Sequence, residues 1–274
     1  MVLSFGGTNA VCAILMLLCF SGWLMSQDTA GRQNAPSGYA YATDSVRVPI
    51  VIAKLQKGDF GLVDIEIIAE AKAVQAIPAL ENQYEKSTDL DTKEKIANAL
   101  VRLGGDPNGK YWDLLATHAD EVLTNGAPNP FAYKSDGTTL LEPSSQFVDW
   151  AKSHNLDLST ALHNATFDAT GAILDIATTD DPRSLPFLRK AVQSQNHMVA
   201  IVGALGLAEL KDSDSVNLII EAAKHAPKEA AGVIAEALVY FDTPDAQQAF
   251  DAFVPKEMAK ALREARSQGK TPFR

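Results

Sequence analysis

Histidine is the residue type in this chain most readily used for metal or proton chemistry, because neutral imidazole binds metals and titrates near neutral pH. His118 and Glu121 lie three residues apart, a spacing that would place two ligands on one helix face. No third ligand follows at the spacing of a zinc site, and no HExxH motif occurs. We therefore interpret the histidines as helix-surface groups and expect no metal. The five are His118, His154, His163, His197 and His225.

Motifs for nucleophilic catalysis and for phosphate binding are incomplete. The chain has no GxSxG sequence, which would place a serine on a nucleophile elbow. The stretch Gly269–Thr271 resembles the end of a phosphate-binding loop, but Glu264 occupies the position of its first glycine. The glycines at 203 and 206 fall inside a helical pattern, which favours close helix packing over dinucleotide binding. These patterns predict a protein without catalysis and without a cofactor.

Acidic pairs recur where helices are expected to begin. Asp181, Asp212 and Thr243 each open an apolar helical pattern, and successive openings are 31 residues apart. Side chains of this type cap helices by accepting backbone N–H bonds, so the carboxylates are predicted to be caps. The same offset relates further positions, namely Ser184, Ser215 and Ala246, and the pairs Val202/Val233, Ala204/Ala235, Leu207/Leu238 and Leu210/Phe241. One helix pair cannot bury both of its faces, so neighbouring pairs must stack.

The opening helix follows the pattern D-x-x-[AS]-[VL]-P-x-L, and an Ala- and Leu-rich second helix comes after it. In these features the chain resembles the HEAT-repeat family in its short bacterial form. The resemblance covers residues 73–105 and 181–268 well, and 46–72 and 106–180 more loosely. It implies an all-α fold, a right-handed, armadillo-like α-solenoid of stacked antiparallel helix pairs with a concave binding surface. The inner-helix arginine of eukaryotic forms does not recur regularly here.

One long segment, residues 124–145, interrupts the array with five glycines and prolines that exclude a helix. Long loops in compact arrays often have a function. Two interpretations remain open: the insertion packs over a face of the array, or it binds a partner. His163 belongs to a polar cluster at 163–168, which is either part of a binding surface or an ordinary solvent face. The candidate partner-binding residues are Phe131, Tyr133, Trp150, Trp112 and His163.

The N-terminal region is distinct in composition. Residues 10–25 are almost wholly apolar and contain both cysteines, and no charged side chain occurs in the first 27 residues. Residues 1–26 therefore read as a signal peptide or an N-terminal anchor, although the basic residues that usually precede such a segment are missing. A flexible tether at 27–45, the repeat domain at 46–268 and a tail at 269–274 follow. The expected location is periplasmic or secreted, with membrane contact only through residues 10–25 if they remain uncleaved.

Composition limits the kinds of partner. The net charge is −10, which repels phosphate backbones and argues against nucleic-acid binding. Aromatic residues make up only 7% of the chain, a balance that favours packed helices over a β-sandwich. The leading hypothesis is a non-catalytic scaffold or adaptor that binds another protein. The alternatives are an enzyme-associated or lyase-like HEAT protein handling a small molecule, and a structural envelope protein.

Overall fold

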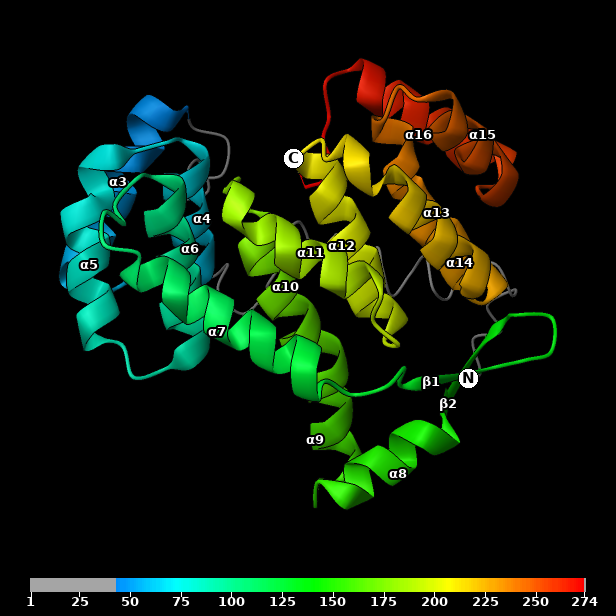
Figure 1. Cartoon of the computed structure of the whole chain (residues 1–274). Coiled ribbons are helices and arrows are strands. Elements are labelled where there is room, and N and C mark those ends of the chain that lie inside the picture. The colour runs from blue at the N-terminus through cyan, green and yellow to red at the C-terminus, as the bar shows by residue number, and fades with distance from the viewer. Residues whose placement is uncertain (1–42, 274) are drawn as a thin grey trace, which may run out of the picture. The chain divides into compact units, whose positions relative to one another are not determined.

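The computed structural model describes residues 43–273, and this part of the chain is mostly helical (Figure 1). The predicted signal or anchor segment at 1–26 and most of the tether lie outside the described residues. Among the helices that are described, none combines the length and apolar character needed to cross a membrane. The chain divides between Leu115 and Ala116 into two compact units, called here the N-terminal and C-terminal units.

The N-terminal unit begins with helix α3, which starts two residues before the predicted beginning of the repeat domain at 46. The elements are α3 (Asp44–Lys57), α4 (Leu62–Glu70), η3 (Val74–Ala76), α5 (Ile77–Lys86) and α6 (Leu90–Arg102), with α7 (Lys110–Asn125) crossing the division. Gly58 ends α3 with a φ of 76°. Helix α4 ends at Glu70, and Lys72, two residues later, adopts a left-handed φ of 49°.

The C-terminal unit contains the predicted repeats and the insertion. Before the repeats come β1 (Phe131–Tyr133), β2 (Thr139–Pro143), α8 (Ser145–Ser153), α9 (Leu158–His163), the π-helical turn η4 (Asn164–Asp168) and α10 (Ala169–Ala177). The repeats comprise η5 (Pro182–Ser184), α11 (Leu185–Val192), α12 (His197–Glu209), η6 (Ser213–Ser215), α13 (Val216–His225), α14 (Lys228–Glu236), η7 (Ala237–Tyr240), α15 (Pro244–Phe253) and α16 (Lys256–Ser267). The predicted tail is partly anchored, since Thr271 Oγ1 donates to Glu209 Oε1 at 3.0 Å.

The three predicted openings fall at helix starts. Asp181 accepts a bond from the Arg183 N–H at 2.9 Å, and Thr243 Oγ1 accepts one from the Ala246 N–H at 3.3 Å. The prediction that Asp212 caps its helix through its side chain is wrong. Its carboxylate instead receives two bonds from Arg189, at 3.0 and 2.8 Å. This bidentate ion pair connects α11 to the beginning of the next helix pair.

Helix α12 forms the centre of this unit, packed against α10, α11 and α14 (Figure 1). Every residue from Met198 to Ala208 is buried. A Cβ at Gly203 would lie 2.8 Å from Ala191 Cβ, and one at Gly206 would lie 2.8 Å from Leu188 Cδ2. Both distances are shorter than van der Waals contact, so these glycines allow α11 to approach α12 closely. Close helix packing is the role that the sequence predicts for them.

The insertion is non-helical, as expected, but it is shorter and more regular than a loop over 124–145. Helix α7 continues to Asn125 and α8 begins at Ser145. Between them the chain forms a two-stranded antiparallel hairpin in which Phe131 pairs with Pro143 and Tyr133 with Thr139. Glycines and prolines exclude a helix without excluding a strand, so the hairpin could not be read from them.

We predict that Leu207→Asp destabilises the C-terminal unit by about 3–5 kcal/mol, because it places a carboxylate without a counter-ion in the core. Leu207 is 0% exposed. Urea unfolding followed by circular dichroism measures the change. The matched control is Leu158→Asp at a 47% exposed position, for which we expect a change of about 0.5 kcal/mol or less. Equal stability of the two variants would contradict the position assigned to Leu207.

Candidate functional site

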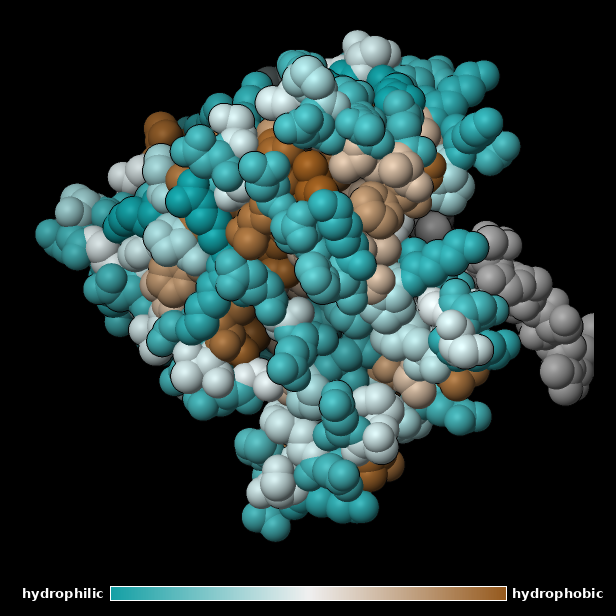
Figure 2. All heavy atoms as spheres, turned by 45° about the vertical axis from the view of Figure 1, so that its right-hand side comes forward, coloured by the Kyte–Doolittle hydropathy of each residue, from teal (hydrophilic) through white to brown (hydrophobic). Residues whose placement is uncertain are grey.

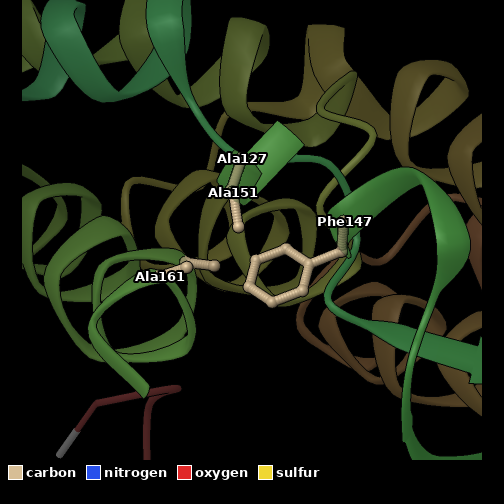
Figure 3. Packing of buried hydrophobic residues seen from close by; sticks show 5 residues of the cluster. Ala127, Phe147, Ala151 and Ala161 are labelled. Carbon is tan, nitrogen blue, oxygen red and sulfur yellow. The ribbon is translucent and has the colours of Figure 1, made fainter. Parts of the chain in front are cut away.

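A small hydrophobic cluster fixes the base of the insertion. The Phe147 ring is fully buried between Ala127, which precedes the hairpin, and Ala151 and Ala161 of the two following helices (Figure 3). Ser144 adds polar contacts: its Oγ donates to the Asn129 carbonyl at 2.8 Å and accepts from the Phe147 N–H at 3.1 Å. The two ends of the insertion are therefore held together, and the hairpin projects from a fixed base.

The far part of the hairpin contacts the beginnings of helices α12 and α14 (Figure 1). Tyr133 Oη lies 2.8 Å from Nδ1 of His197, the first residue of α12. The Thr139 N–H donates to Glu229 Oε2 at 3.0 Å. Gly137, with a φ of 82°, approaches α14 so closely that a Cβ there would lie 2.7 Å from the Lys228 nitrogen. We call residues 131–143 the strap, because they join two successive helix pairs.

Burial perturbs both groups of the tyrosine–histidine contact. It raises the pKa of Tyr133 to about 12, with a smaller opposing effect of the Asn129 amide. It also lowers the pKa of His197. Desolvation penalises the phenolate and the imidazolium alike, so both side chains are neutral near pH 7. In the tautomer that carries its proton on Nε2, the phenol O–H donates to the lone pair of Nδ1.

His197 also contributes to a pocket of about 270 Å³ between successive helix pairs. The apolar part of its wall comes from Val192, Ala200, Leu218, Ala222, Ala226 and Ile234, and the polar part from Gln193, Ser194, His197, Glu221 and His225. His225 Nδ1 lies 2.7 Å from the Glu221 carbonyl. A carbonyl only accepts, so His225 donates from Nδ1 and its Nε2 carries the lone pair in the neutral ring.

The polar cluster predicted at 163–168 is a π-helical turn. The Ala169 N–H donates to the carbonyl of Asn164, five residues back, and not to that of Ala165. The Ala165 carbonyl accepts instead from Asn196 Nδ2 at 2.6 Å, while Asn196 Oδ1 caps α12 at the Met198 N–H. The buried Asn196 side chain therefore supplies a hydrogen-bond partner to a carbonyl of the π turn and to an N–H of the first turn of α12. Turns of this kind occur frequently at functional sites.

Large apolar side chains are exposed along α9 and this turn. Leu158 is 47%, Leu162 36% and Phe167 59% exposed. Leu158 and Leu162 share a helix face because they are four residues apart. Phe167 follows in the π turn, and its ring lies 5.6 Å from that of His163. We call these three apolar side chains the apolar stripe.

The five predicted binding residues have different environments. Tyr133 and Phe131 are half-buried in β1, and the Tyr133 hydroxyl holds the strap. Trp150 is half-buried and stacks on Phe147, with ring centroids 5.9 Å apart. His163 is exposed beside the apolar stripe. Trp112 is buried in the N-terminal unit, so its assignment as a binding residue is replaced by a core role.

Several residues of the site were not predicted from sequence. Leu158, Leu162 and Phe167 have the spacing and hydrophobicity of core residues, and only the structure shows that they face solvent. The sequence contains one indication of a helix start at Asn196 and His197, because an Asn followed by an apolar helical run is typical of an N-cap. Nothing local to the sequence indicates their contacts with Ala165 and Tyr133.

No cluster of three or more His, Cys, Asp or Glu side chains suited to a metal occurs among residues 43–273. His118 Nε2 lies 3.5 Å from Asp168 Oδ1, and this contact lowers the pKa of Asp168.

A comparison with protein-family models, curated proteins and solved structures finds no match to the chain. Function must therefore be inferred from the geometry of the site.

We predict that Asn196→Ala lowers the free energy of unfolding by about 1–3 kcal/mol, because it leaves a buried carbonyl unsatisfied and removes a cap. Asn196→Asp separates the two effects. Its carboxylate can still cap α12 but cannot donate to the Ala165 carbonyl. Hydrogen exchange should then rise in the π turn and remain near the wild-type rate at the start of α12. Equal protection of the π turn in wild type and Asn196→Asp would contradict this contact.

A second prediction concerns Glu236 of α14, whose carboxyl makes no hydrogen bond or ion pair with another residue of the described chain. Burial raises its pKa to about 7, from an ordinary value of 4.5. Between these two values the unfolded chain releases its proton before the folded chain does, so stability falls as pH rises.

Glu236→Gln should therefore be more stable than wild type by about 1–3 kcal/mol at pH 8 and nearly equal to it at pH 4. Urea unfolding at both pH values measures this difference. Glu257→Gln, at an exposed position of α16, is the control and should follow the wild type. A constant difference between Glu236→Gln and wild type across this range would show that the carboxyl does not titrate as described.

Proposed function

We propose that this protein is a non-catalytic interaction scaffold or adaptor that binds a helical segment of another protein through the apolar stripe. The carrying observation is the exposure of Leu158, Leu162 and Phe167 on α9 and the π turn that follows it. Figure 2 shows that hydrophilic residues cover most of the face it presents, as expected for a chain of net charge −10. Contiguous exposed apolar side chains on such a surface mark interaction sites more often than isolated ones do.

The proposed architecture is a right-handed HEAT-like α-solenoid. The recurrence of helix starts at Asp181, Asp212 and Thr243 supports it, as does the buried character of the equivalent Ser184, Ser215 and Ala246. Such arrays present extended surfaces to their partners. Residues 1–26 are proposed to direct export to the periplasm or the exterior, or to anchor the protein in a membrane.

The spacing of the apolar stripe favours a helix as the bound element. Side chains one turn apart form a ridge that fits between the ridges of a second helix. Asp157, the cap of α9, and the partly exposed Asp168 border the stripe. A partner helix with an apolar face flanked by Lys or Arg would complement this border.

The available burial is enough for a moderate contribution to affinity. Burying a fully exposed Leu or Phe side chain contributes about 1.5–3 kcal/mol. The three side chains are about half exposed, so their complete burial would contribute roughly 3 kcal/mol, or about 100-fold in Kd. Affinity beyond this value would require polar contacts or additional surface.

One observation favours a second candidate, the handling of a small molecule by an enzyme-associated or lyase-like HEAT protein. The pocket beside His197 has an apolar wall with polar groups at several positions. Ligand sites share this composition, although their volumes usually begin near 300 Å³. This pocket, at about 270 Å³, is at the lower limit.

The test places a photo-crosslinking residue at position 167 in the full chain, in its native cells. We expect a specific adduct with another protein, mapping to a helix with basic flanks. The matched control carries the same residue at Gln248, which is exposed on α15. With the purified partner, Leu162→Ser/Phe167→Ser should weaken binding by about 10- to 100-fold without lowering Tm.

Three outcomes would reject this proposal. One is an identical set of adducts from positions 167 and 248. Another is an adduct with a second copy of this chain. The third is unchanged affinity of the double variant for the crosslinked partner.

A further inference from the structure

We propose that the contact between Tyr133 and His197 is an acid-released latch, which holds the strap on the helix array near neutral pH and frees it when His197 gains a proton. This inference concerns the strap and does not depend on the identity of any partner. It rests on the 2.8 Å contact between Tyr133 Oη and His197 Nδ1, which joins residues 64 positions apart.

The direction of the hydrogen bond follows from its surroundings. Asn129 Nδ2 donates to the Phe131 carbonyl at 2.5 Å, and the same amide opposes the rise in the pKa of Tyr133. A phenol oxygen that accepts from this amide has its own proton available for the neutral Nδ1 of His197. Protonation of Nδ1 removes this acceptor. The Tyr133 O–H can then no longer donate to Nδ1, and burial penalises the imidazolium in this position until water reaches it, which favours separation of the strap from His197.

Charged groups around His197 already have partners that the structure shows. Glu229 accepts from the Thr139 N–H, and Asp168 contacts His118. Lys190 of α11 pairs with Asp120, and Glu221 of α13 pairs with Lys224. The remaining titratable or charged groups on these elements are Tyr133, Lys134, Asp136, Glu142, His163, Asp175, Arg189, Glu209, His225, Lys228 and Glu236. Asp175 also has a partner within the described chain.

The sign of the pH effect follows from burial. Burial lowers the pKa of His197, and no carboxylate offsets this effect. Because the free imidazole titrates near 6.5, the latch is fully formed above that pH and is lost as pH falls through the lower folded-state pKa. Loss of the latch leaves the strap with the Thr139–Glu229 bond and the close approach of Gly137 to α14.

Release has a defined structural consequence. The half-buried Phe131 and Tyr133 would detach from the array, and the beginning of α12 would become accessible beside the pocket that His197 lines. The base of the strap would stay in place, because the Phe147 cluster and Ser144 contain no group that titrates in this range. Acid would thus move the strap about its base while the helix pairs remain folded.

The test is hydrogen–deuterium exchange of residues 131–143 in the full chain at pH 7.5 and pH 5.0, corrected for the intrinsic exchange rate. Wild type should open about 5- to 10-fold more often at the lower pH, the factor expected for loss of one hydrogen bond. His197→Asn retains an acceptor at the δ position and does not titrate, so its exchange should be independent of pH. Tyr133→Phe should be open at both pH values.

His225→Asn is the matched control, since it removes another histidine of the same pocket and should keep the wild-type pH response. Nitrogen NMR of wild type provides a measurement that needs no variant. It should show Nδ1 of His197 unprotonated at pH 7.5 and protonated as the strap opens. A protonated Nδ1 at pH 7.5, or the same acid response in His197→Asn as in wild type, would overturn the latch.

Discussion

The burial of α12 on every side is the constraint on which the C-terminal unit depends. Met198 to Ala208 contact neighbours all around the helix, and Gly203 and Gly206 leave no room for a side chain. A helix enclosed in this way has neither a polar face nor freedom to shift along its axis. Its first turn is therefore held in place by the whole repeat array, which makes it a rigid attachment point for less regular parts of the chain.

Two adjacent residues at the start of α12 bond to less regular parts of the chain. Asn196 bonds to the π turn at Ala165, and His197 bonds to the strap at Tyr133. The apolar stripe and the strap, the two surfaces with proposed roles, are thus both connected to the start of the same buried helix. Sites built on rigid elements keep their geometry better than sites carried by free loops. The strap also contacts α14 through Glu229, so it joins successive helix pairs that also meet through helix packing and through Arg189, which bonds to Asp212 and Ser215.

The sequence predicts the regular part of this structure well and the site poorly, for a physical reason. Capping side chains and apolar periodicity are local, so the helix starts at Asp181 and Thr243 could be placed in advance. The contact of Tyr133 with His197 spans 64 positions and has no local signal. Trp112 illustrates the opposite error, because an aromatic side chain suits a binding groove and a core equally well, and here it is buried.

The π turn sets the rotational phase of everything that follows it. In an α-helix each residue advances the helix by about 100°, so one additional residue rotates all later side chains by that amount about the axis. The turn at Asn164–Asp168 absorbs one residue without breaking the helix, which allows α10 to keep its buried face while Phe167 stays beside His163. Backbone length thus determines which side chains this segment presents to solvent. Inserting or deleting one residue in the turn would rotate apolar side chains from the surface into the core, and core side chains toward the surface, although every other residue stayed the same.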